Sequence, residues 1–293
     1  MIRFVSSLVD PWLNRRNRDT PERRAARAAV EHLTPAVVIT GGSRGIGYAL
    51  ARVFLAHGHT VLIVARGEAD LTTARQLLEV SERARCSSLA LDVTARDAAD
   101  RIATKLADDG CYLDVLVNNS ATGLSGPFDL QTGEMLDKLI AVNVTAVTRL
   151  MDHALRGMLA RGRGGILNMA SLGGYVPGPN QAAYYASKAY VLSLSEAVAS
   201  EISGRGVRVC VVAPGPVGTR FHADMGADTA LYRKLLPEVS PGHVARAAYR
   251  AFTIGQRVVV PGIAYRLAFL SLRLLPHTLS VPLTGRLLKN PDG

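Results

Sequence analysis

The chain is poor in cysteine, and the few that it has are scattered. Its 293 residues include only Cys86, Cys111 and Cys210, and none of them belongs to a Cys-x-x-Cys pair. A disulfide framework or a zinc site needs paired or clustered ligands, so we expect neither a disulfide nor a metal. Free cysteines in a chain of this length are typical of a reducing, cytoplasmic compartment.

Long uncharged hydrophobic runs are also missing. No stretch reaches the ~18 apolar residues that a membrane-spanning helix needs. The apolar run at the N-terminus is interrupted by Asp10 and Pro11, which makes it too short for the apolar core of a secretory signal. The sequence therefore predicts neither a spanning helix nor a secretory leader.

Aromatic residues make up only 5% of the chain, although its formal net charge is +10. A basic surface that binds single-stranded nucleic acid usually interleaves its cations with aromatic rings on which bases stack. The densest basic segment has no such rings between its arginines, which are Arg15, Arg16, Arg18, Arg23, Arg24 and Arg27. We therefore expect no nucleic-acid partner.

Apolar residues are abundant, at 48% of the chain, and they alternate in a regular way. Short apolar runs without polar interruption predict strands at 36–40, 60–65, 87–91, 113–117, 165–170, 207–213 and 257–260. Helical segments separate these runs, the longest at 132–160 and 182–202. Strands buried on both faces between helices predict a single α/β domain, a Rossmann-like doubly wound parallel sheet with about seven strands. We expect this domain at 36–262, an N-terminal helical extension at 1–35 and an apolar helical C-terminal extension at 263–293.

A glycine-rich turn follows the first expected strand and opens the first helix. Gly41, Gly45 and Gly47 are spaced Gly-x-x-x-Gly-x-Gly. Glycines let the backbone turn tightly, and the helix N-terminus offers free N–H groups to a diphosphate. An ordinary glycine-rich turn is the alternative. With its position in the alternating pattern, this spacing resembles that of the short-chain dehydrogenase/reductase family over about 36–262.

The resemblance implies a nicotinamide dinucleotide cofactor, and two arginines favour its phosphorylated form. Arg66 ends the second expected strand, where no carboxylate stands, and Arg44 lies within the glycine turn. A guanidinium suits a 2′-phosphate, whereas an acidic residue would suit a free ribose. We therefore expect NADP(H) rather than NAD(H). Glu68 stands close to this position, and the alternative is that both arginines are solvated surface charges.

Further motifs match the cofactor-binding pattern of that family. Asn118-Asn119-Ser120-Ala121 departs from its Asn-Asn-Ala-Gly motif at two small residues, and Thr219 closes a Pro-Gly-x-Val-x-Thr motif. The cofactor-binding residues implied by the resemblance are Gly41, Ser43, Arg44, Gly45, Ile46, Gly47, Arg66, Asp92, Val93, Asn119, Tyr184, Lys188, Pro214, Gly215, Val217 and Thr219.

Tyr184 and Lys188 are four residues apart, so they share one face of an expected helix. An ammonium beside a phenol favours the phenolate, so we expect Lys188 to lower the pKa of Tyr184. Ser171, at a strand end, is placed to hydrogen-bond a carbonyl oxygen. The order Asn143, Ser171, Tyr184, Lys188 is similar to the family's catalytic tetrad, in which Tyr184 would donate a proton and Asn143 would support its resupply through a water. For Asn143 alone, the alternative is a satisfied buried amide.

The segment 220–240 corresponds to the family's substrate lid. Its apolar residues, with others near Ser171, predict a hydrophobic pocket that includes Leu172, Tyr175, Phe221 and Met225. Leu231, Tyr232, Leu235 and Leu236 extend the apolar part of the lid. A hydrophobic ketone, a 3-oxoacyl chain or a lipid-like or steroid-like molecule would suit this pocket. The alternative is that these residues pack on the protein's own core or on a partner subunit.

The C-terminal extension carries an apolar stretch at 263–275, in which Arg266 and Arg273 share one helical face. Such a segment either packs against the domain or a second copy, which we favour, or makes a peripheral membrane contact. The resemblance also implies a homodimer or homotetramer formed through the long helices.

These features together predict an NADPH-dependent carbonyl reductase. An NADP-dependent alcohol dehydrogenase working in the oxidative direction would use the same residues. A non-catalytic dinucleotide-binding scaffold would need only the cofactor half, so Asn143, Ser171, Tyr184 and Lys188 argue against it.

Overall fold

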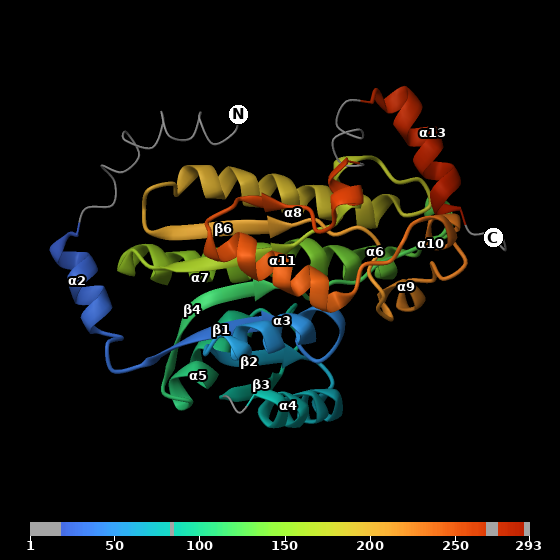
Figure 1. Cartoon of the computed structure of the whole chain (residues 1–293). Coiled ribbons are helices and arrows are strands. Elements are labelled where there is room, and N and C mark those ends of the chain that lie inside the picture. Colours follow the sequence, from blue (N-terminus) through green and yellow to red (C-terminus); the bar gives the residue numbers. More distant parts are fainter. Residues whose placement is uncertain (1–18, 83–84, 268–274, 290–293) are drawn as a thin grey trace.

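The computed structural model describes residues 19–82, 85–267 and 275–289 of the chain. Seven parallel strands form one sheet in the order β3-β2-β1-β4-β5-β6-β7, as the alternating apolar runs predict (Figure 1). The strands are β1 (Thr34–Thr40), β2 (Thr60–Ala65), β3 (Cys86–Ala90), β4 (Cys111–Asn118), β5 (Gly164–Met169), β6 (Val207–Val212) and β7 (Val258–Val259). The doubly wound, Rossmann-like fold is therefore confirmed.

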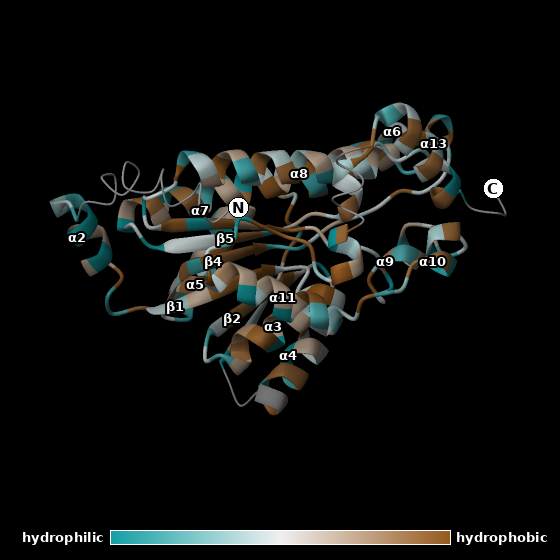
Figure 2. Cartoon of the chain, turned by 45° about the horizontal axis from the view of Figure 1, so that its top comes forward, coloured by the Kyte–Doolittle hydropathy of each residue, from teal (hydrophilic) through white to brown (hydrophobic). Residues whose placement is uncertain are grey.

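Helices cover both faces of the sheet, which is why its strands need no polar side. On one face lie α3 (Gly45–Ala56), α4 (Glu68–Glu82) and α11 (Pro241–Thr253), packed on the β1 residues Val37 and Ile39. On the other lie α5 (Ala98–Asp108), α7 (Val147–Arg161) and α8 (Ala182–Glu201), packed on Ala36 and Val38. Figure 2 shows the strands as hydrophobic ribbons between these layers.

Successive strands are added on one side of β1 up to β3 and on its other side from β4 onward, so β1 lies between β2 and β4. The loops that leave the carboxyl ends of β1 and β4 therefore diverge to opposite faces and leave a crevice between them. In open parallel sheets, ligands bind in this crevice. The glycine turn follows β1, so the fold brings it to that place.

The long helical region expected over 132–160 is present, but it contains a π-helical turn that the sequence did not predict. The structure has α6 (Gly133–Ile140), a π-helical segment η3 (Ala141–Ala146) and then α7. A π-helical turn holds one extra residue, which re-aims the side chains around it, and such turns are frequent at functional sites. Here the widened turn contains Asn143, which is buried.

Helices α2 and α13, near the two ends of the chain, lie outside the layers that cover the sheet. The helix α2 (Pro21–Ala28) falls within the expected N-terminal helical extension, and the Thr20 hydroxyl caps it by accepting from the backbone N–H of Arg23. The helix α13 (His277–Leu288) lies against α10 (Leu231–Leu235) (Figure 1). Of the expected apolar segment 263–275, residues 263–267 are helical, whereas Arg273 lies outside the described residues. In the described parts of the chain, no helix is long and apolar enough to span a bilayer.

Candidate active site

A cavity of about 1370 Å³ runs along the carboxyl ends of the strands, from the glycine turn to the lid. Pockets for one small ligand usually measure ~300–1,000 Å³, so this one has room for a cofactor and a substrate together. Most of the expected site residues line it, namely Gly41, Ser43, Arg44, Gly45, Ile46, Arg66, Asp92, Val93, Asn119, Ser171, Leu172, Tyr184, Lys188, Pro214, Gly215, Val217, Thr219, Phe221 and Met225.

The backbone of the glycine turn requires glycine at specific positions. Gly41 and Gly45 have φ values of +65° and +59°, which other residues adopt only with strain. Gly47 does not line the cavity, but a Cβ there would overlap the carbonyl oxygen of Gly41, so helix and turn could not pack. The following helix α3 has no side-chain cap, because its N-cap residue is Arg44. Its first N–H groups are therefore available to an anion, and the turn fits a cofactor diphosphate.

Thr40, which the sequence did not single out, joins the ends of β1 and β4. Its hydroxyl accepts from the backbone N–H groups of Asn119 and Ser120, both at 3.0 Å, and donates to the Val117 carbonyl at 3.3 Å. The Asn119 amide donates to the carbonyls of Thr40 and Gly41 at 3.0 and 3.2 Å. These bonds hold the two diverging loops at a fixed separation. The Asn119 side chain thereby fixes the backbone of the glycine turn at Thr40 and Gly41.

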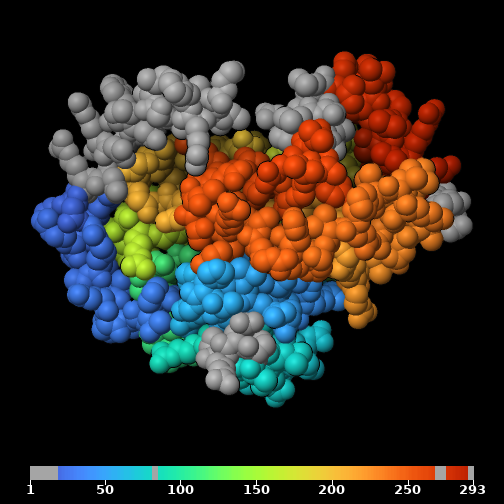
Figure 3. Space-filling model, in the orientation of Figure 1, coloured from blue at the N-terminus to red at the C-terminus, as the bar shows by residue number. Residues whose placement is uncertain are grey.

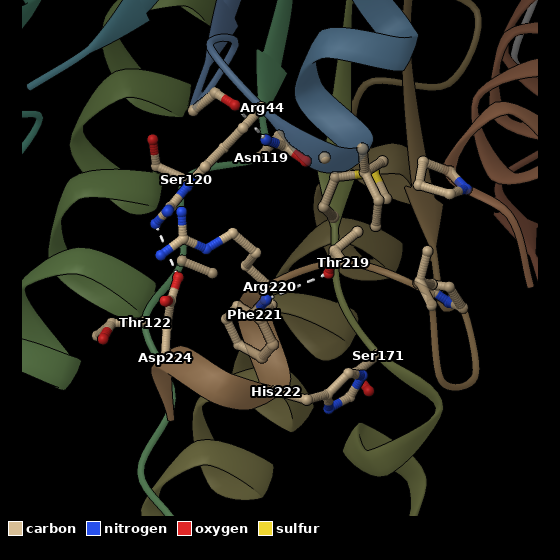
Figure 4. Close-up of a pocket in the computed structure, with 18 of the residues that line it drawn as sticks. Arg44, Asn119, Ser120, Thr122, Ser171, Thr219, Arg220, Phe221, His222 and Asp224 are labelled. Atoms are coloured by element: carbon tan, nitrogen blue, oxygen red, sulfur yellow. Dashed lines mark hydrogen bonds and ion pairs between the residues drawn. The ribbon is translucent and has the colours of Figure 1, made fainter. Parts of the chain in front are cut away.

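The two arginines expected at the cofactor phosphate differ in their surroundings. Arg44 forms an ion pair with Asp224 of the lid helix α9 (Phe221–Asp224), at 2.9 Å (Figure 4). Arg66 is exposed at the end of β2 and contributes to lowering the pKa of Asp92. Asp92 itself is held by the backbone N–H and the hydroxyl of Thr94, at 2.9 and 2.8 Å. Burial works against its ionisation, but these bonds and Arg66 keep its pKa below the usual value.

Tyr184, Ser171 and Lys188 come together at the centre of the cavity, from α8 and from the end of β5. Burial raises the pKa of Tyr184 above its ordinary value, and a hydrogen bond with Ser171 lowers it in part. Lys188 lies with its ammonium 5.7 Å from the centre of the Tyr184 ring and donates to the Met169 carbonyl at 3.0 Å. Burial lowers the pKa of Lys188 to about 8.

The expected lowering of the Tyr184 pKa by Lys188 is therefore wrong for the protein chain itself. Burial of the phenol is the main cause of the rise in its pKa, and Lys188 gives its hydrogen bond to the Met169 carbonyl rather than to the phenol. The other tyrosine of the pair, Tyr185, packs its ring against Gly173, where a Cβ would lie 2.8 Å from the ring.

Asn143 is a buried amide whose side-chain groups all have partners. Its oxygen accepts from the backbone N–H of Thr122 at 2.9 Å, and its nitrogen donates to the Thr122 carbonyl at 2.8 Å and to the Ser187 hydroxyl at 3.0 Å. The Ser187 hydroxyl donates in turn to the Tyr184 carbonyl at 2.7 Å. Asn143 thus ties the loop after β4 to the helix that carries Tyr184, as the alternative of a satisfied amide predicts.

The lid end of the cavity differs in part from the expectation. Leu172, Phe221 and Met225 line it, and the Phe221 ring lies 5.6 Å from that of Tyr184. Tyr175 does not, because it packs into the core beside Val191 and Val211. Leu231 and Leu235 are exposed on the outer side of α10. Helix α13 contributes to the cavity wall instead, through Thr284, Leu287 and Leu288.

A polar group that the sequence did not reveal lies among these apolar walls. The Tyr232 hydroxyl is 2.7 Å from Nδ1 of His222, and both side chains line the cavity. Burial lowers the pKa of His222 to about 4, aided by the positive charge of Arg233. Gln181 also lines the cavity at 2% exposure, and its side chain hydrogen-bonds Tyr232 and so partly offsets the rise in the Tyr232 pKa that burial causes. No local pattern could have revealed this group, because Gln181 and the lid residues are about 40 or more positions apart.

Thr219 marks the border between the two halves of the cavity. Its hydroxyl accepts from the backbone N–H of Phe221 at 3.3 Å and so starts the lid (Figure 4).

Among the residues that the structure describes, no cluster of three or more His, Cys, Asp or Glu side chains could hold a metal ion.

The known proteins that this chain resembles are dehydrogenases. The family profile described as short chain dehydrogenase matches residues 35–230. The sorbitol dehydrogenase of Cereibacter sphaeroides is 36% identical over 199 residues, which cover 68% of this chain and 76% of that enzyme. The 3beta-hydroxysteroid dehydrogenase 1 of Eggerthella lenta is 34% identical over 224 residues, which cover 72% of this chain and 84% of that enzyme. A solved short-chain dehydrogenase from Sphingobium yanoikuyae in complex with NADPH has a TM-score of 0.72 at 30% identity, covering 81% of this chain and 92% of that one.

Proposed function

Because the chain belongs to the short-chain dehydrogenase family, we propose that it reduces the ketone group of a hydrophobic substrate with NADPH. It is an oxidoreductase that acts on an alcohol or carbonyl group and uses a nicotinamide dinucleotide. The direction, the phosphorylated form of the cofactor and the substrate class are the parts that we propose.

The observation that carries the proposal is the meeting of Tyr184, Ser171 and Lys188 within one cavity that also contains the glycine turn. A scaffold that only binds a dinucleotide would not need a half-buried phenol beside a hydroxyl at the other end of the cleft. The cofactor, held by the glycine turn and the loops after β2, β3 and β4, would supply a hydride to the carbonyl carbon.

The residues of this chain would manage the proton and the carbonyl oxygen. Ser171 would donate a hydrogen bond to the carbonyl oxygen and stabilise the negative charge that grows on it. The Tyr184 O–H bond would break as its proton moves to that oxygen, which leaves a phenolate. Lys188, with a pKa of about 8, is close enough to stabilise the phenolate and to return a proton to it.

The raised pKa of Tyr184 suits the proton donation that a reduction requires. A phenol that holds its proton at neutral pH is ready to donate, whereas oxidation of an alcohol would need the phenolate as base. An NADP-dependent alcohol dehydrogenase remains the second candidate, because the same residues serve both directions.

Arg44 and Arg66 support the preference for NADPH. Both line the cofactor end of the cavity, where Arg44 pairs with Asp224 of the lid and Arg66 helps to lower the pKa of Asp92. A guanidinium pairs well with a phosphate through two parallel hydrogen bonds.

The substrate end of the cavity supports a hydrophobic ketone, such as a 3-oxoacyl, lipid-like or steroid-like molecule. Its walls are apolar at Leu172, Phe221, Met225, Leu287 and Leu288. The polar group there is neutral at physiological pH, since His222 has a pKa of about 4. It would therefore accept a hydroxyl or a second carbonyl more readily than a charged group.

We also propose that the protein is a homodimer or homotetramer that associates through α6 and α8. Met135, Ile140 and Tyr190 on these helices expose apolar side chains to the surroundings. Each is more than one third exposed, although the rest of the apolar face of both helices is covered. Exposed apolar residues on neighbouring helices are typical of an interface.

The test is a binding titration followed by a turnover assay on the full chain. NADPH and NADH are titrated side by side by calorimetry, and NADPH oxidation is then followed at 340 nm with a panel of hydrophobic ketones. Tighter binding of NADPH and turnover of an apolar ketone are expected. Equal or tighter binding of NADH would overturn the cofactor preference, and binding without turnover of any ketone or alcohol would favour the scaffold.

A further inference from the structure

Helix α13 buries two small polar residues and exposes two of its leucines, whereas Leu287 and Leu288 face the cavity. Ser280 and Thr284 are buried at 0% and 8% exposure, whereas Leu279 and Leu283 are 62% and 50% exposed. The Thr284 hydroxyl donates to the Ser280 carbonyl at 2.7 Å, so it finds its partner within the helix. Leu279 and Leu283 are four residues apart in α13 and share its outward side, and Leu275 is exposed just before the helix begins.

The packing of α13 against the domain sets this orientation. Gly285 faces Pro179, and a Cβ at Gly285 would come within 3.3 Å of it. On the same inner side, Thr284 and Leu288 reach the cavity. Turning the helix to bury its exposed leucines would break both contacts. Figure 3 shows α13, in red, at the edge of the molecule.

The charge of this part of the chain is of one sign. Residues 263–290 contain no aspartate or glutamate, but they include Arg266, Arg273, Arg286 and Lys289. Arg286 follows Leu283 by three residues on the same exposed side of α13, and Lys289 is exposed just beyond the helix. An apolar stripe flanked by cations, without acidic residues, is suited to the interface of an anionic lipid layer.

We propose that α13 docks on an anionic lipid surface through Leu275, Leu279 and Leu283, with Arg286 and Lys289 facing the head groups. A second copy of the chain fits this face less well. A two-fold contact would oppose the like charges of Arg286 and Lys289, and Asp292 is the one acidic residue in the sequence beyond 262. Ile263 and Leu267, 79% and 63% exposed, extend the apolar surface of the same extension.

The inner side of α13 gives this docking a consequence for the site. Thr284, Leu287 and Leu288 line the substrate end of the cavity, so the helix would lie between that cavity and the lipid. If the proposed function holds, an apolar ketone dissolved in the membrane would reach the cavity without crossing bulk water. The docking itself does not depend on the proposed function.

The test is flotation of the full chain with vesicles of phosphatidylcholine alone and with about one third phosphatidylglycerol. The protein is expected to float only with the anionic vesicles and to lose most of that binding at 1 M salt, where the screening length falls to ~3 Å. Leu279→Ser with Leu283→Ser should weaken the partition about tenfold or more. Arg286→Gln with Lys289→Gln should weaken it severalfold.

A matched control replaces two exposed apolar residues elsewhere, Leu77→Ser with Val80→Ser on α4, and should float like the parent. Unchanged NADPH affinity and circular dichroism would show that each variant is folded. The proposal is overturned if the parent does not bind anionic vesicles, or if the leucine variant floats equally well. It is also overturned if the leucine variant instead dissociates an oligomer in light scattering, because a second copy would then be the occupant.

Discussion

The carboxylate of Asp224 lies 2.9 Å from the guanidinium of Arg44, and this pair joins the substrate lid to the glycine turn. Arg44 is the residue that we assign to the cofactor's 2′-phosphate, so the lid and the phosphate would compete for one cation. Both side chains are more than one third exposed, and such pairs contribute only ~0.2–1 kcal/mol.

Asp224→Asn is therefore expected to raise the affinity for NADPH about two- to fivefold and to leave that for NADH unchanged. Calorimetry at low salt would measure both. Asp228→Asn, which removes the same charge from the same lid, should have a smaller effect. A parallel gain for both cofactors would instead point to a general opening of the lid.

Tyr184→Phe is expected to lower kcat by ~10²–10⁴-fold, because it removes the proton donor. The affinity for NADPH, measured by fluorescence titration, should change little. Tyr185→Phe is the matched control, since its hydroxyl is not part of the proposed chemistry, and it should retain most activity. Comparable losses in the two variants would contradict the assignment of the proton to Tyr184.

Lys188 gives stability a predictable pH dependence. Its pKa falls from 10.5 to about 8 on folding, so the unfolded chain binds this proton more tightly. Stability should therefore be reduced below pH 8 and recover as the pH rises toward 10.5, by up to ~3 kcal/mol for this group.

Lys188→Met removes that dependence and also a hydrogen bond of ~1 kcal/mol to Met169. We expect the variant to be more stable than the parent at pH 7, and the difference to disappear and reverse by pH 10.5, as measured by urea unfolding. Lys234→Met, at an exposed lysine, should show no such trend. A pH-independent difference for Lys188→Met would mean that the lysine is not held in a low-pKa state.

Gly47→Ala is expected to destabilise the protein by more than ~1–3 kcal/mol and to abolish cofactor binding, because the new methyl group would overlap the Gly41 carbonyl. Thermal unfolding with and without NADPH would measure both effects. Gly133→Ala, where no atom lies within 4 Å of the added carbon, should be neutral or slightly stabilising. An unchanged NADPH-induced shift in Gly47→Ala would argue against the glycine turn as the diphosphate site.

Much of this protein follows from patterns within short stretches of sequence. A strand buried on both faces must be apolar throughout, so the runs at Val37–Ile39 or Val61–Val64 announce a parallel sheet by themselves. The glycine spacing needs only positive φ and close packing, and both are properties of adjacent residues. The order of Asn143, Ser171, Tyr184 and Lys188 along the chain can likewise be recognised without knowing the distances between them.

What only the tertiary structure decided are relationships between segments far apart in the chain. Asp224 meets Arg44 across 180 positions, and α13 contributes Thr284, Leu287 and Leu288 to the cavity wall. The direction of the Tyr184 pKa depends on how much water the assembled lid excludes, which no local pattern encodes. In α13, Ser280 and Thr284 are buried while Leu279 and Leu283 face outward, an orientation that depends on how the helix packs on the rest of the chain.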